Sequence, residues 1–152
     1  MKLLLTMTTW LGLALANACA QCPDFSIEDL QTLLKTEPHL REDAIRRHGF
    51  DLHQQWTEKG GATFWRYNRC WYTTVSDRAF YDHVLLWNTS HNRFTFCTSN
   101  KAQYMRMLKS VESRHPGGNV AGTFVGKMFR YEFGLQTMDG LDYYAVTLSL
   151  RQ

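Results

Sequence analysis

The chain has 152 residues, a length typical of a single domain. Hydrophobic residues make up 44% of it, aromatic residues 14%, and the formal net charge is only +3, a composition that excludes a disordered chain. Glu42 and Asp43 interrupt the nearest approach to a basic run, formed by Arg41, Arg46 and Arg47. The sequence therefore argues against a nucleic-acid-binding protein, which needs clustered Lys and Arg.

The first 20 residues have the pattern of an export signal. Lys2 precedes an uncharged stretch over residues 3–18, and Ala18 and Ala20 supply small residues where a signal peptidase cuts. The stretch is shorter than the roughly 20 residues of a membrane-spanning helix. We expect residues 1–20 to be a signal peptide, residues 21–25 an N-terminal tail and residues 26–152 one exported domain, periplasmic or secreted.

A lipoprotein is the alternative reading of the same segment. Residues 16–19 read Ala-Asn-Ala-Cys and resemble a lipoprotein cleavage box, in which Cys19 becomes the lipidated first residue. Ala16 and Asn17 depart from the residues usual at those positions. Lipidation at Cys19 would tether the domain to a membrane, and otherwise we expect no membrane contact.

Two helices are predicted at the start of the domain. Ser26 is placed to cap the first helix, with Asp29 positioned to complete a capping box. The apolar residues of this helix fall at helical spacing on one face: Ile27, Leu30, Leu33 and Leu34. Pro38 interrupts the pattern, so a second helix should begin near Glu37 and end at Gly49.

Strands follow this helical part. Residues 62–75 are dense in aromatic and β-branched residues and come directly after the turn dipeptide Gly60-Gly61. Residues 82–87 and 93–98 flank a polar loop of about five residues, a common length for a hairpin connection. These segments predict antiparallel strands.

A third helix and two more strands complete the chain. Ser99 or Asn100 caps the helix, and Pro116 with Gly117 ends it. Residues 129–133 and 144–150 alternate between apolar and polar side chains, which indicates a sheet with one packed and one wet face. We predict an α+β fold: an antiparallel sheet of about five to six strands, packed on one face by two to three helices.

Two short sequence echoes raise the question of an internal repeat. Residues 33–35 (Leu-Leu-Lys) parallel residues 107–109 (Met-Leu-Lys), and residues 64–67 (Phe-Trp-Arg-Tyr) parallel residues 128–131 (Met-Phe-Arg-Tyr). A degenerate two-fold repeat and chance patterning both account for them. The layout of a helix followed by antiparallel strands, present twice, resembles that of β-lactamase inhibitor proteins, a resemblance of architecture alone.

Three cysteines lie beyond the predicted signal: Cys22, Cys70 and Cys97. Any two of them can pair in an oxidising compartment, and a fully reduced set is the alternative. We expect a Cys70–Cys97 disulfide because both residues lie in predicted strands, whereas Cys22 lies in the tail. Such a bond would close a loop of about 27 residues and stabilise the fold by roughly 3 kcal/mol.

No sequence motif for catalysis or metal binding is present. His48 and His53 do not have the spacing of a helical zinc site, and Asp82 and His83 are strand neighbours that should point to opposite faces. The patterns of serine nucleophiles and phosphate-binding loops are also missing. We therefore expect no catalytic residue, metal or cofactor.

Three functions remain open. The first is non-catalytic binding of another protein or an envelope component through the wet sheet face or the loops, which we favour. The second is binding of a carbohydrate or small ligand by clustered aromatic rings, with Trp65, Tyr67, Trp71 and Tyr72 as the candidate residues. The third is a small hydrolase that uses an Asp/His or Cys/His pair.

Overall fold

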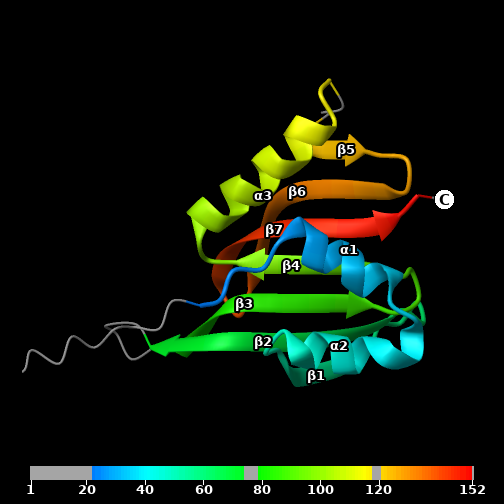
Figure 1. Ribbon diagram of the computed structural model, residues 1–152. Coiled ribbons are helices and arrows are strands. Elements are labelled where there is room, and N and C mark those ends of the chain that lie inside the picture. The colour runs from blue at the N-terminus through cyan, green and yellow to red at the C-terminus, as the bar shows by residue number, and fades with distance from the viewer. Residues whose placement is uncertain (1–21, 74–78, 118–120, 152) are drawn as a thin grey trace, which may run out of the picture.

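The computed structural model describes residues 22–73, 79–117 and 121–151 (Figure 1). The expected signal peptide and Cys19 lie outside the described residues. Among the residues that are described, no helix combines the length and apolar character needed to cross a membrane.

The first helices form as their sequence signals predict. Helix α1 (Ile27–Lys35) begins with a capping box, in which the Ser26 hydroxyl accepts a hydrogen bond from the Asp29 amide and the Asp29 carboxylate accepts one from the Ser26 amide. A short 3-10 turn, η1 (Pro38–Leu40), leads into α2 (Arg41–Arg47). Gly49, with φ +78°, ends this helix and turns the buried Phe50 back against it.

The strands form one antiparallel sheet of seven in the described part of the chain, one or two more than expected. Their order across the sheet is β1-β2-β3-β4-β7-β6-β5. The elements after α2 are β1 (Asp51–Thr57), β2 (Thr63–Thr73), β3 (Ala79–Asn88), β4 (Arg93–Thr98), α3 (Lys101–Arg114), β5 (Thr123–Val125), β6 (Phe129–Met138) and β7 (Leu141–Leu150). The predicted α+β class is confirmed, and the strands that the prediction lacked, β1 and β5, are the two edges of the sheet.

The main core lies between the sheet and the helices, and Figure 1 shows α1, α2 and α3 on the same side of the sheet. Leu30, Leu33 and Ile45 of the helices are fully buried there, against Phe94 and Phe96 of β4. We call the opposite side of the sheet the open face.

The alternation of apolar and polar residues had suggested that the open face is wet. Part of this face is instead buried. Figure 1 shows β6 and β7 curving behind β4 at one end, and a second, smaller core of Val84, Cys97, Tyr143 and Ala145 forms on that side. The Tyr143 hydroxyl donates a hydrogen bond to the Tyr81 carbonyl oxygen at 2.9 Å. The curvature therefore turns part of the open face into a concave, partly buried surface.

The described part of the expected N-terminal tail is docked on the domain. Phe25 is 1% exposed in the main core, and its ring contacts those of Phe50 and Phe96. Residues 22–25 therefore belong to the folded unit.

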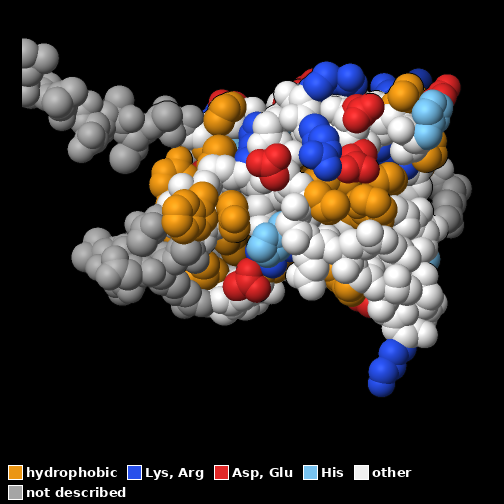
Figure 2. Space-filling model, turned by 90° about the horizontal axis from the view of Figure 1, so that it is seen from below, with side chains coloured by type: hydrophobic (Ala, Val, Ile, Leu, Met, Phe, Trp, Pro, Cys, Tyr) orange, Lys and Arg blue, Asp and Glu red, His pale blue; other side chains and the backbone are white. Residues whose placement is uncertain are grey.

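The edge of the sheet at β1 is strongly exposed. Figure 2 views the molecule from below Figure 1, the side where β1 and α2 lie, and shows hydrophobic patches beside charged side chains of both signs. Large apolar side chains with high exposure include Leu52 of β1 (38%) and Trp71 of β2 (62%).

Candidate functional site

The four aromatic residues proposed for ligand stacking do not form one surface. Tyr67 is fully buried and Trp65 packs partly buried against the same helix-side core, where its ring contacts that of Trp87. Tyr72 is half-buried and stacks on Phe80, while Trp71 is 62% exposed. Trp65 and Tyr67 therefore serve packing, and only Trp71 presents a ring broadly to solvent.

The disulfide joins Cys22 to Cys70, which corrects the expected Cys70–Cys97 pair. Cys97 is a buried free thiol of the second core, and burial raises its pKa to about 12. Strand β3 lies between β2, which carries Cys70, and β4, which carries Cys97. Strands two places apart are separated by roughly 10 Å, too far for a disulfide.

A buried polar cluster of Arg69, His83 and Gln103 lies beneath this disulfide. Arg69 donates from Nε to His83 Nδ1 at 2.9 Å and from its two terminal nitrogens to the carbonyl oxygens of His48 and Pro23. All of these acceptors belong to the protein, so Arg69 ties the N-terminal segment and the end of α2 to the sheet.

His83 is held at both ring nitrogens. Its Nε2 lies 2.7 Å from Gln103 Oε1, and the Gln103 amide donates in turn to the Phe25 carbonyl oxygen. Because Nδ1 accepts from Arg69, the ring proton must lie on Nε2. Burial and then the Arg69 charge lower the pKa of His83 to about 4, so the imidazole is neutral at pH 7.

The Asp82–His83 pair is closer than the strand alternation had suggested, with 3.6 Å between Asp82 Oδ2 and His83 Nε2. A general base needs a nitrogen lone pair that faces the substrate. The only such lone pair of His83 faces Arg69 and lies 3.2 Å from Cys22 Sγ, which is already oxidised. This arrangement favours a structural role for the pair.

Cys22, Cys70 and His83 also form the one cluster in the described segments whose donor atoms lie close enough together, within 4.8 Å, for a metal ion. Thiolates are the metal ligands that cysteine supplies, and these two sulfurs are joined in a disulfide. His83 Nδ1 is already an acceptor for Arg69. In this oxidised form the two cysteines form a structural disulfide and do not supply metal ligands.

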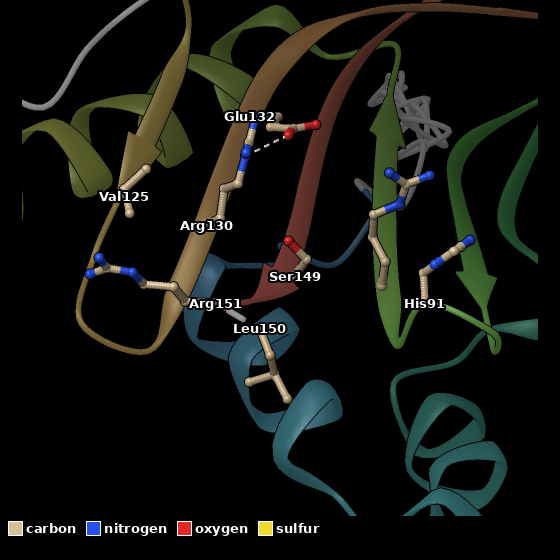
Figure 3. A pocket seen from close by; sticks show the side chains of 8 residues that line it. His91, Val125, Arg130, Glu132, Ser149, Leu150 and Arg151 are labelled. Atoms are coloured by element: carbon tan, nitrogen blue, oxygen red, sulfur yellow. Dashed lines mark ion pairs between the residues drawn. The ribbon is translucent and has the colours of Figure 1, made fainter.

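The open face carries a trough with a volume of about 610 Å³, shown in Figure 3. Its floor is a row of paired residues that crosses three strands: Arg93 of β4, Ser149 of β7 and Arg130 of β6. Each lies next to a residue of the main core, Phe94, Leu148 and Phe129 respectively, so each points away from the helices. We call this hollow the basic trough.

The neighbouring row of the sheet is hydrophilic as well. Thr95 of β4, Thr147 of β7 and Glu132 of β6 are paired across the strands, and the two threonine hydroxyls lie 2.9 Å apart. Val125 and Leu150, about half exposed, supply the apolar side chains of the trough lining (Figure 3). The floor of the trough thus offers guanidinium and hydroxyl groups.

Positive charge predominates in the basic trough, where three arginines face one glutamate. Arg130 Nε lies 2.8 Å from Glu132 Oε1, and both side chains are about half exposed. In the described part of the chain, the guanidinium groups of Arg93 and Arg151 have no hydrogen-bond or ion-pair partner, although both line the trough. The trough therefore has unused capacity for an anion.

Sequence reasoning did not identify this trough. The alternation of Phe129 and Tyr131 with Arg130 and Glu132 placed the charged pair on the wet face, but a single strand gives no information about its neighbours. The same alternation, applied to Arg93 and Ser149, would have placed them on that face as well. What was missing is the strand order β4-β7-β6, which brings the three residues into one row.

Comparison with known proteins gives no further guide: no protein-family model, curated protein or solved structure matches this chain. The candidate site therefore has to be interpreted from its own geometry.

Proposed function

We propose that this chain is an exported, non-catalytic binding domain whose basic trough binds an acidic glycan of the cell envelope. The observation that carries the proposal is the pair of guanidinium groups, Arg93 and Arg151, on the uncovered face of the sheet, which have no acidic partner among the residues that the structure describes. Carboxylate or phosphate groups on the glycan would supply the missing acceptors.

The polar floor of the trough favours a hydrophilic ligand. Protein–protein interfaces have an apolar or aromatic centre, whereas the centre of the trough consists of Arg93, Ser149 and Arg130 beside two threonines. Sugar hydroxyls can exchange hydrogen bonds with the serine and threonine hydroxyls while acidic groups engage the arginines.

The position of the trough also favours a glycan over an extended acidic peptide. Peptides often bind to sheets by adding a strand at an edge, where backbone groups are unpaired. The trough instead crosses β4, β7 and β6, which are paired with one another along their lengths. A ligand lying on these three strands can use side chains only.

Two features support the export part of the proposal. The first 20 residues have the composition of a signal peptide, and the Cys22–Cys70 disulfide suits an oxidising compartment. We expect the mature protein to be recovered outside the cytoplasm with a mass that corresponds to a start at Gln21. A mass that includes Met1 or a lipid on Cys19 would contradict cleavage before Gln21.

The binding test uses oligogalacturonate, a carboxylated glycan, and its neutral methyl ester, measured by isothermal titration calorimetry. Replacing Arg93 and Arg151 together by Met should weaken oligogalacturonate binding about tenfold or more, because two charge-assisted contacts are lost. The methyl ester should bind weakly to both proteins. Raising the salt concentration should weaken oligogalacturonate binding to the wild type.

Arg47→Met is the matched control. Arg47 is exposed at the end of α2, on the helix side of the sheet, so its replacement should leave binding unchanged. Equal losses in the control and the double variant, or equal binding of the ester, would overturn the proposal. Oligoglutamate that binds more tightly than oligogalacturonate would replace the glycan with an acidic peptide.

A further inference from the structure

A second hollow lies on the concave part of the open face. It has a volume of about 430 Å³ and is lined by the apolar side chains of Trp56, Leu86 and Met138 together with Arg66 and Asp139. Trp56 is held in a stack with Phe64 of the neighbouring strand, with the ring centroids 5.3 Å apart. We call this hollow the concave pocket; it shares no lining residue with the basic trough.

Arg66 brings a buried positive charge to the wall of this pocket. Its side chain is only 9% exposed, and a charge so far removed from water needs an acceptor of opposite charge. Nε donates to Asn68 Oδ1 at 3.1 Å and Nη2 to Asp139 Oδ2 at 2.7 Å. The counterion comes from the β6–β7 turn, because β6 and β7 curve over this end of the sheet.

The carboxylate of this ion pair is much more exposed than the arginine. The Asp139 side chain is 69% exposed, so its carboxylate reaches Arg66 from the solvent side. Asp139 and Gly140 both have positive φ, 52° and 70°, which defines a tight two-residue turn between β6 and β7. An exchange of partners at Arg66 would therefore take place at an exposed turn, outside the buried core.

Asn68 shows that hydrogen-bonding capacity next to Arg66 is unused. Asn68 is 3% exposed, and its Nδ2 has no hydrogen-bond partner, while its Oδ1 accepts from Arg66. A buried donor without an acceptor destabilises the folded protein.

We propose that the concave pocket is a binding site for a small amphipathic carboxylic acid, with its carboxylate on Arg66 in place of Asp139 and its apolar part against Trp56, Leu86 and Met138. The two oxygens of a carboxylate match the donors that Arg66 presents. The pocket volume falls within the range of small-molecule sites. Asp139, which contacts Arg66 in this structure, would compete with this ligand.

The test compares decanoate with decanol, its uncharged counterpart, by isothermal titration calorimetry. Decanoate should bind the wild type about tenfold more tightly than decanol, because one charge-assisted contact is added. Asp139→Asn removes the competing charge, and Asn tolerates the positive φ of that position. It should strengthen decanoate binding about tenfold and leave decanol binding unchanged.

Two further variants complete the test. Arg66→Met should abolish the preference for decanoate, and Asp142→Asn, a change at a nearby exposed carboxylate outside the pocket, should change nothing. Arg93→Met with Arg151→Met should also leave decanoate binding intact, so the result is separate from the outcome for the glycan. Unchanged or weaker decanoate binding by Asp139→Asn would overturn the proposal, as would an equal gain in Asp142→Asn.

Discussion

Arg69 on the helix side and Arg93 on the open face show how differently one residue type is used on the two faces of the sheet. All three donor groups of Arg69 meet acceptors of the protein, and its guanidinium lies 4.6 Å from the centre of the Phe50 ring. Arg93 is half-buried without a described partner. The comparison suggests that polar groups on the helix side hold the fold together, and that those on the open face remain available for ligands.

The disulfide should have the largest effect on stability of any feature on the helix side. Replacing Cys22 and Cys70 by Ser removes a cross-link between residues 48 positions apart. The loop-entropy estimate for that separation is a loss of about 4 kcal/mol in the free energy of unfolding. Urea denaturation of the variant and the wild type measures the difference.

Cys97→Ala is the control for that experiment, because it removes the third thiol without touching the cross-link. It should cost less, since it deletes only one buried atom. If Cys97→Ala destabilises the protein more than the double serine variant does, the prediction that the Cys22–Cys70 disulfide has the larger effect on stability is wrong.

The next effect is a pH dependence that arises from His83. Its pKa is about 4 in the folded protein and 6.5 when exposed, so the unfolded chain binds the extra proton between these values. The contribution of His83 to the free energy of unfolding is complete above pH 6.5. It decreases by about 3 kcal/mol as the pH falls to 4.

The measurement is the difference in unfolding free energy between the wild type and His83→Gln, from pH 7 to pH 4, which cancels the titration of other groups. This difference should shrink by about 3 kcal/mol as the pH falls. NMR titration of the His83 ring provides a check that needs no variant. An imidazole that becomes charged near pH 6.5 would refute the buried neutral state.

The smallest predicted effect belongs to the open face. Glu132→Gln removes the carboxylate that competes for Arg130, and a half-exposed ion pair contributes roughly 0–1 kcal/mol. Oligogalacturonate affinity should rise about two- to fivefold while the free energy of unfolding changes by less than about 0.5 kcal/mol. Glu112→Gln on the exposed side of α3 should alter neither quantity, and a drop in affinity for Glu132→Gln would count against competition in the trough.

Local signals in the sequence predicted most of the fold. The capping box at Ser26, the end of α2 at Gly49 and the β3–β4 hairpin all depend on residues close together in the chain. The two edge strands were not predicted, each for a different reason. Strand β1 is exposed along almost its whole length and so shows no apolar alternation, and β5 has three residues, too few for a period to appear.

The candidate sites could not be predicted in the same way. Arg66 and Asp139 are 73 positions apart and meet only because β6 and β7 curve over the sheet. Cys22 reaches Cys70 because the buried Phe25 docks the N-terminal segment. Contacts of this kind depend on strand order and sheet curvature, which single-strand patterns do not specify.

The most direct test of the contrast between the two faces is a matched pair of variants, Arg69→Met and Arg93→Met, each measured for unfolding and for oligogalacturonate binding. Arg69→Met should lower the free energy of unfolding by about 3 kcal/mol or more, because it leaves buried acceptors without donors. Arg93→Met should change stability by less than about 0.5 kcal/mol and weaken binding. If Arg93→Met destabilises the protein as much as Arg69→Met, or leaves binding intact, the assignment of the open face to ligand binding is contradicted.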